Sequence, residues 1–194
     1  MASEKDRKQR KVIIVGAGLV GSLQALYFGQ RSYDVEVYEY RSDPRTEANV
    51  AGRSINLALS KRGRDALKAV GAEEQVVKTG IPMYARMIHS HDGKQTPIPY
   101  GKKGQHILSI DRRALNEHLI SLVEQHPNVK FHFDSKCVEA NLKEPQVTFQ
   151  RKKGDEQKFV EKADLVVGCD GSFSGIRKDL MKLNRMDYSQ VRLF

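Results

Sequence analysis

The chain has 194 residues, enough for one ordinary domain with its own core, and its 39% apolar and 29% charged residues are typical of a globular protein. No stretch approaches the ~20 uninterrupted apolar residues of a membrane-spanning helix, so we expect no membrane span. The net charge of +9 is concentrated toward the two ends, but aromatic and basic residues do not interleave, so we expect no nucleic-acid partner.

A βαβ unit is predicted at the start of the chain. Residues 1–10 form a basic tail without the apolar core of a signal peptide. Residues 11–15 (KVIIV) are a β-branched run typical of a buried parallel strand. Residues 22–31 carry apolar side chains at helical spacing, and residues 34–38 (DVEVY) read as a second strand. This order predicts a parallel sheet.

The turn inside this unit has the pattern Gly16-x-Gly18-x-x-Gly21. The first glycine allows a tight turn, the second lets a pyrophosphate approach the backbone, and the third lets helix and strand pack closely. Glu39 follows the second strand, where a carboxylate can accept hydrogen bonds from ribose hydroxyls and would repel a 2′-phosphate. The motif predicts a dinucleotide site and does not distinguish NAD from FAD.

The middle of the chain mixes helices with short extended pieces. Residues 41–53 read as a loop, residues 61–70 as a helix ending at Gly71, and residues 82–100 as two strands joined at Asp92-Gly93. Residues 112–126 form the strongest predicted helix, with Asp111 as its N-cap. Further strands are predicted at residues 106–110, 129–133, 136–142, 146–152, 157–162 and 163–168.

These elements predict an α/β fold with a parallel central sheet and inserted antiparallel strands. The last predicted strand runs into Gly168-Cys169-Asp170-Gly171. From this stretch alone, Cys169 could be a nucleophile, Asp170 a ligand-binding residue, or the whole a plain strand-to-helix turn. The two cysteines, Cys137 and Cys169, lack metal-binding spacing, so we expect reduced thiols and no metal site.

Several stretches together resemble one family. GAGLVGS, GRSINLALSKRGRDALKAVG, ARMIHS, IPYG, LVVGCDG and MDYSQ are similar to the N-terminal part of the kynurenine 3-monooxygenases, which are class A flavoprotein hydroxylases. The resemblance runs from about Lys11 to Gln190. It implies a Rossmann-like FAD-binding domain, with bound FAD, NADPH as electron donor, and hydroxylation of L-kynurenine to 3-hydroxykynurenine by O₂.

The resemblance also assigns residues. The positions implied for FAD are Gly16, Gly18, Val20, Gly21, Tyr38, Glu39, Tyr40, Arg41, Ala58, Arg112 and Asp170. Those implied for the substrate are Arg86 and Tyr100, and an arginine can clamp the α-carboxylate of kynurenine with two parallel hydrogen bonds. The resemblance makes Asp170, rather than Cys169, the functional residue of this stretch. A neighbouring acid also raises the pKa of a thiol, which makes Cys169 a poor nucleophile. No catalytic side chain is assigned.

The resemblance also bears on organisation. It implies a tail at residues 1–10, an FAD-binding domain at 11–190 with the start of the substrate region, and an atypical end at 191–194. Family members continue further, so we expect a truncated form that binds FAD weakly or not at all and has reduced or no activity alone. The alternatives are a non-catalytic interaction protein and an NAD(P)-dependent reductase, which would need a Tyr-x-x-x-Lys pattern that the chain lacks.

Location follows from the same likeness. The family is membrane-associated on the cytosolic face of the mitochondrial outer membrane, through a C-terminal segment that we do not find here, so this chain could be cytosolic. The sequence does not indicate an oligomeric state.

Overall fold

The computed structural model describes residues 10–46, 56–152 and 157–183. It divides into two compact units, residues 1–47 with 123–194, and residues 48–122, and each is described by itself. Parts of three predictions lie outside the described residues: the tail up to residue 9, the loop over residues 47–53, and the end at 191–194.

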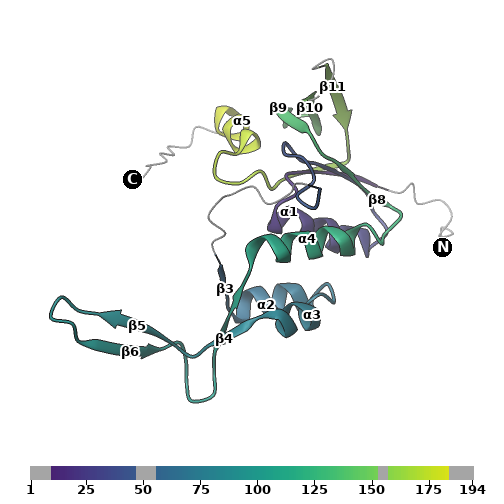
Figure 1. The fold of residues 1–194 in the computed structure, drawn as a ribbon. Helices are drawn as coiled ribbons and strands as arrows, with labels where there is room; N and C mark the ends of the chain where they lie inside the picture. The colour runs from purple at the N-terminus through teal and green to yellow at the C-terminus, as the bar shows by residue number, and fades with distance from the viewer. Residues whose placement is uncertain (1–9, 47–55, 153–156, 184–194) are drawn as a thin grey trace. The chain divides into compact units, whose positions relative to one another are not determined.

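The first unit is built on a four-stranded parallel sheet with strand order β12-β1-β2-β8 (Figure 1). The strands are β1 (Lys11–Val15), β2 (Asp34–Tyr38), β8 (Val129–His132) and β12 (Leu165–Gly168). Helix α1 (Leu19–Gly29) connects β1 to β2. The β-branched residues of the central strands are fully buried, as is usual where helices and a second layer cover a parallel sheet. The predicted α/β fold with a parallel sheet is confirmed.

An antiparallel sheet of three strands completes this unit, in the order β11-β10-β9. The strands are β9 (Ser135–Asn141), β10 (Gln146–Arg151) and β11 (Lys158–Lys162). Helix α5 (Gly175–Leu183) contacts β9, where the Ala140 N–H donates to Asp179 Oδ2 at 2.9 Å. Phe149 is fully buried in the core between the layers and stacks on Tyr38, with ring centroids 3.9 Å apart.

The second unit contains the antiparallel strands β3 (Leu57–Leu59), β7 (Ile107–Ile110) and β4 (Ile81–Met83), in the order β3-β7-β4. Its helices are α2 (Lys61–Lys68), α3 (Glu73–Thr79) and α4 (Arg112–Val123), the last of which ends at the unit boundary. The strands β5 (Ala85–His89) and β6 (Gln95–Pro99) form a long hairpin (Figure 1).

Two local predictions in this unit, the hairpin turn and the helix N-cap, are confirmed. The hairpin turns at Asp92-Gly93, with Gly93 at φ +81°, and the Ala114 N–H donates to Asp111 Oδ1 at 2.7 Å, as an N-cap requires. Helix α3 was not predicted, because its seven residues are too few for a helical apolar period to stand out. Among the described residues, none of the helices combines the length and apolar character needed to cross a membrane.

Glu36 links two strands of the parallel sheet and makes the fold sensitive to acid. Its carboxylate, 12% exposed, pairs with His132 Nε2 of β8, and this hydrogen bond lowers the pKa of Glu36 against the opposing effect of burial. A carboxyl group whose pKa is depressed in the folded state stabilises the protein above its ordinary pKa, and that contribution is lost as the pH falls.

We therefore expect Glu36→Gln to lower the melting temperature at pH 7, with the gap to wild type narrowing as the pH falls below the ordinary value of 4.5. Thermal melts followed by circular dichroism between pH 7 and pH 3 measure this. Glu144→Gln, at an exposed turn, is the matched control and should follow the wild-type curve. A gap of constant size across the whole range would contradict the expectation.

Candidate functional site at the carboxyl edge of the sheet

Short backbone hydrogen bonds bring three predicted motifs to one edge of the parallel sheet. The Gly16 N–H donates to Tyr38 O, and the Cys169 N–H donates to Val15 O, each at 2.7 Å. The glycine turn after β1, the acid after β2 and the aspartate after β12 therefore meet at the carboxyl ends of their strands. Open α/β sheets bind their ligands at this edge.

The three glycines are required for different reasons. Gly16 has φ +101°, and a Cβ there would lie 2.5 Å from Cys169 O. A Cβ on Gly21 would lie 1.8 Å from Gly16 O. A Cβ on Gly18 would have no atom within 4 Å. The fold itself thus requires Gly16 and Gly21, as predicted, whereas the space before Gly18 is open and fits the predicted approach of a pyrophosphate.

Helix α1 begins directly behind this open space. Its N-cap is Gly18, which has no side chain to cap the helix, and its first turn contains no acidic residue. Val20, in that turn, is 61% exposed. The amides of the first turn and the positive end of the helix dipole therefore favour an anion at this position.

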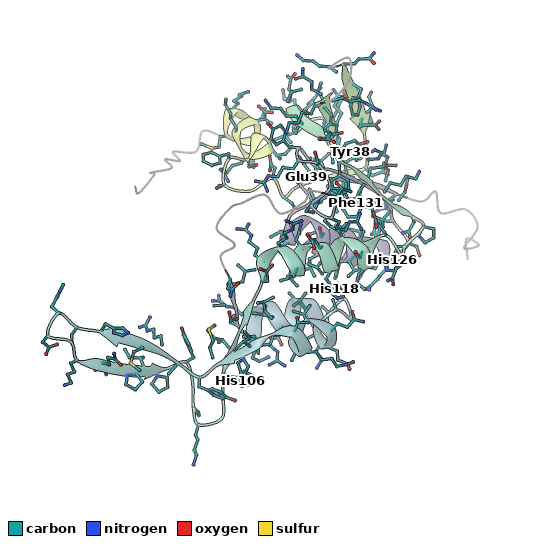
Figure 2. The ribbon with its side chains drawn as sticks, in the orientation of Figure 1. Tyr38, Glu39, His106, His118, His126 and Phe131 are labelled. Carbon is teal, nitrogen blue, oxygen red and sulfur yellow. The ribbon has the colours of Figure 1, made fainter. Side chains whose placement is uncertain are left out.

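Glu39 is held across the glycine turn. Its Oε2 accepts a hydrogen bond from the Ala17 N–H at 2.8 Å, and its Oε1 accepts one from the Arg41 N–H at 2.9 Å. Figure 2 shows Glu39 beside Tyr38 at the end of β2. Each carboxylate oxygen has a further acceptor position, so Glu39 can still accept ribose hydroxyls as predicted.

The residues flanking Glu39 differ in what they offer. Tyr38 is 3% exposed and stacks between His132 and Phe149, and burial raises the pKa of its hydroxyl. Its side chain belongs to the core, so only its backbone reaches the site. Tyr40 is 49% exposed, with Lys152 Nζ lying 4.4 Å from its ring centroid, and Arg41 is exposed as well. The predicted cofactor contacts of these residues stay predictions.

Asp170 has one satisfied and one unsatisfied carboxylate oxygen. Its Oδ2 accepts hydrogen bonds from the Gly175 N–H at 2.7 Å and the Ile176 N–H at 3.3 Å, at the start of α5. Its Oδ1 is buried and has no hydrogen-bond partner among the described residues. A buried acceptor without a partner is costly, so this oxygen is well suited to receive a hydroxyl of a bound ligand.

The loop that follows Asp170 is open to a ligand and is held from behind. Gly171 has φ +79°, and a Cβ there would have no atom within 4 Å. The Arg177 guanidinium donates to the Ser172 carbonyl and, at 3.4 Å, to the Gly171 carbonyl. Arg177 therefore orders the loop from within α5.

Cys169 lacks the features of a nucleophile. Burial, and then the charge of Asp170, raise the pKa of Cys169 to about 11. Burial also raises the pKa of Cys137 to about 12. Both thiols therefore stay protonated near neutral pH, where a nucleophilic cysteine needs the opposite shift. No cluster of three or more metal-ligating side chains occurs in the part of the chain that the structure describes.

The other predicted residues lie in the second unit. Ala58 is exposed on β3 opposite Ser109, and Arg112 is the exposed first residue of α4. Arg86 pairs with Ile98 in the hairpin of β5 and β6, and Tyr100 follows Ile98 by two residues. Tyr100 lies just beyond β6, and its N–H donates to Tyr84 O at 2.9 Å, so the pairing continues past the strand end and favours one face of the hairpin for Arg86 and Tyr100.

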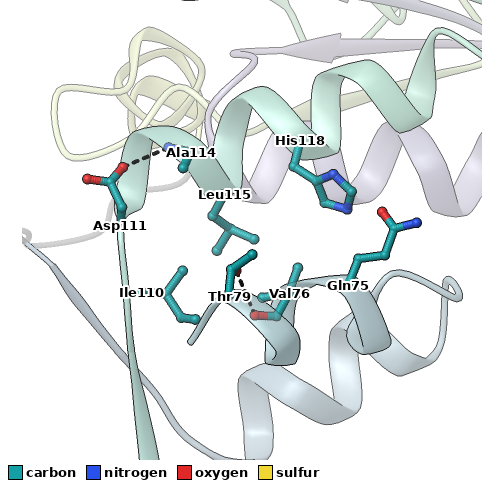
Figure 3. Close-up of a pocket in the computed structure, with 8 residues that line it drawn as sticks. All are labelled: Gln75, Val76, Thr79, Ile110, Asp111, Ala114, Leu115 and His118. Atoms are coloured by element: carbon teal, nitrogen blue, oxygen red, sulfur yellow. Dashed lines mark hydrogen bonds between the residues drawn. The ribbon is translucent and has the colours of Figure 1, made fainter. Parts of the chain in front are cut away.

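A cavity of about 250 Å³ also lies in the second unit (Figure 3). Its lining comes from α3, the end of β7 and the start of α4: Gln75, Val76, Thr79, Ile110, Asp111, Ala114, Leu115 and His118. Its polar side chains include Gln75 and His118, whose Nε2 is buried without a hydrogen-bond partner in the described residues. None of the predicted cofactor or substrate residues lines this cavity.

Four features form a candidate site for a dinucleotide at the carboxyl edge of the sheet: the glycine turn, the start of α1 without a capping side chain, Glu39 and the unsatisfied oxygen of Asp170. Residues 9–188 match the family described as FAD binding domain, and the chain belongs to that family. The residues present fit its cofactor, because both an open phosphate cradle and an unpaired buried acceptor are in place.

Two curated relatives are kynurenine 3-monooxygenases. The chain is 47% identical to kynurenine 3-monooxygenase of Caenorhabditis briggsae, over 92% of this chain and 42% of that protein. It is 50% identical to kynurenine 3-monooxygenase of Drosophila willistoni, over 94% of this chain and 41% of that protein. The chain thus spans about two fifths of the length of these relatives.

Among solved structures, the fold is similar to that of p-nitrophenol 4-monooxygenase PnpA from Pseudomonas putida DLL-E4. The TM-score is 0.73 at 21% identity, over 89% of this chain and 43% of that chain. At this identity, the likeness supports the fold and gives no information about the substrate.

Proposed function

We propose that this chain forms the nucleotide-binding part of an FAD- and NADPH-dependent enzyme that hydroxylates L-kynurenine to 3-hydroxykynurenine with O₂. The identity to kynurenine 3-monooxygenases supports the substrate, and NADPH is the electron donor that the resemblance implies. The observation that best supports FAD as the cofactor is the buried, unpaired Asp170 Oδ1, which lies at the same edge of the sheet as the glycine turn.

Each residue has a role in binding rather than in bond breaking. The first-turn amides of α1 and the open backbone at Gly18 hold the pyrophosphate, while Glu39 and Asp170 accept hydroxyls of the cofactor. Bound FAD supplies the redox chemistry with NADPH and O₂. In the second unit, Arg86 clamps the substrate carboxylate and Tyr100 offers a hydroxyl and a ring to the same ligand.

The first test is FAD binding by the purified chain. Binding is followed by the change in the visible fluorescence of added FAD. Retention of the visible flavin absorption through gel filtration supports the proposal. A chain that neither retains FAD nor changes its fluorescence contradicts the cofactor assignment.

The second test addresses the substrate. L-kynurenine should change the absorption spectrum of the FAD-bound chain, and a titration of this change gives its affinity. Arg86→Ala should lower that affinity about tenfold or more, since a charged hydrogen-bonding partner is lost. Arg86→Lys keeps the charge and loses the two-pronged geometry, so it should fall between wild type and alanine. Equal responses in all three proteins would remove Arg86 from the substrate site.

Two further properties of the proposed enzyme can be tested: its catalytic activity and its location in the cell. Kynurenine-dependent oxidation of NADPH by the FAD-loaded chain measures how much of the reaction this part supports. We propose for the enzyme the location of the resembled family, the cytosolic face of the mitochondrial outer membrane, which cell fractionation tests directly.

A further inference from the structure

The segment of residues 39–42, which carries Glu39, is hydrogen-bonded at both ends to residues 132–135 at the end of β8. Backbone bonds hold its start, with the Glu39 N–H donating to His132 O at 2.9 Å and the Ser135 N–H donating to Glu39 O at 2.8 Å. Asp134 holds its end. The Asp134 N–H donates to Arg41 O at 3.1 Å, and Asp134 Oδ1 accepts from Ser42 Oγ at 2.8 Å.

Asp134 makes these contacts from an unfavourable backbone conformation. Its φ is +54°, in the left-handed region that residues with a Cβ rarely adopt, although aspartate and asparagine tolerate it better than most. Such a conformation persists only where the surrounding contacts enforce it, and it is a common feature of functional sites. Here the enforcing contacts are those to Arg41 and Ser42.

A third contact extends from Asp134 to the exposed ring beside Glu39. The Lys152 N–H donates to Asp134 O at 2.8 Å, and Lys152 Nζ lies 4.4 Å from the centroid of the Tyr40 ring. The ammonium thus covers one face of that ring. Asp134 therefore contacts three residues: Arg41, whose N–H donates to Glu39, Ser42, and Lys152, which follows the end of β10.

We propose that Asp134 is a positioning residue for the adenosine half of the bound dinucleotide. It touches the segment from Arg41 to Ser42 rather than the cofactor, and holds that segment so that Arg41 can donate to Glu39 and Lys152 can cover Tyr40. The proposal rests on the FAD binding proposed above. Ordering these groups before binding raises affinity, because less conformational freedom is lost when the nucleotide arrives.

The test compares Asp134→Ala with Asp134→Asn. Alanine removes the Ser42 contact and disfavours the left-handed backbone, so it should weaken the affinity for FAD and for ADP about tenfold, by the same factor for both. Asparagine tolerates that backbone and keeps an acceptor oxygen for Ser42, so it should restore near-wild-type affinity. ADP carries the adenosine half alone, so an equal loss for both ligands locates the effect there.

A control separates positioning from stability. Asn128 Nδ2 donates to Gly29 O at 2.9 Å and to Tyr33 O at 2.6 Å, before β8 and at the opposite end of the sheet strands from Asp134. Asn128→Ala should lower the melting temperature while leaving the affinity for ADP within about twofold of wild type. The affinities are measured by calorimetry.

The outcomes are distinct. If wild type binds both nucleotides and Asp134→Ala binds ADP as wild type does, the positioning role is wrong and the proposed function stands. If Asp134→Ala lowers the affinity for ADP no more than Asn128→Ala does, when both variants lose the same amount of melting temperature, the positioning role is overturned as well. A wild-type chain that binds neither nucleotide refutes the proposed function and this role together.

Discussion

Gly21→Ala is expected to prevent FAD binding by disrupting the fold around the glycine turn. The added Cβ would lie 1.8 Å from the Gly16 carbonyl oxygen, which is backbone and cannot rotate away. The turn and the start of α1 would have to move apart, at a cost of about 3 kcal/mol or more. For a chain of this length, that loss lowers the melting temperature by roughly 10 °C.

Gly18→Ala is the matched substitution within the same motif. Its Cβ would meet no protein atom within 4 Å, and the φ of Gly18, −72°, suits any residue. We expect its melting temperature to stay within about 4 °C of wild type, since replacing glycine by alanine at an N-cap costs up to about 1 kcal/mol. Its FAD affinity should nevertheless fall about tenfold or more, because the methyl group occupies the space of the pyrophosphate.

Melting curves and FAD titrations of the two variants separate the roles. Unchanged FAD affinity in Gly18→Ala would show that no phosphate approaches this glycine. A wild-type melting temperature in Gly21→Ala would show that the turn can absorb a side chain, against the close approach described above.

Asp170→Asn should lose cofactor affinity while keeping its fold. An amide oxygen can still accept from the Gly175 N–H, but the amide nitrogen then stands where the unpaired Oδ1 stood, and a donor replaces an acceptor. Loss of a hydrogen bond to a charged group costs roughly 1.5–3 kcal/mol, so FAD affinity should fall at least about tenfold. Asp170→Ala should lose the same affinity and also about 1 kcal/mol of stability, because the Gly175 and Ile176 N–H groups at the start of α5 lose their acceptor.

FAD titrations and thermal melts of both variants measure these effects. If Asp170→Asn binds FAD as tightly as wild type, the unpaired oxygen has no part in the site. If Asp170→Ala melts like wild type, the hydrogen bonds to Gly175 and Ile176 do not stabilise α5.

The sequence was most informative where a local pattern has one physical explanation. Glycines at 16 and 21 are needed by the backbone around them, and Asp111 caps the helix that it precedes. The order of elements likewise predicted a parallel sheet with antiparallel strands inserted. For Gly21 and Asp111, the groups that impose the constraint are neighbours in sequence as well as in space, so the local pattern carries the geometry.

Contacts between distant segments could not be predicted. Tyr38 lies next to Glu39 in sequence, yet its ring is taken into the core by Phe149, which belongs to another sheet. The left-handed backbone of Asp134 likewise depends on Arg41 and Ser42, more than ninety residues earlier. Aspartate is tolerated in that conformation, but nothing in its own neighbourhood requires it there.

The central sheet also sets an order of events during synthesis. Strand β12 pairs with β1, and the Lys11 N–H donates to Asp164 Oδ2 across 153 residues of sequence. A ribosome therefore releases the glycine turn long before its partner strand exists, and β1 has one exposed edge for most of that time. Pairing over such a distance is slow. The nascent chain thus carries an apolar strand edge that chaperones would have to shield until residue 168 has emerged.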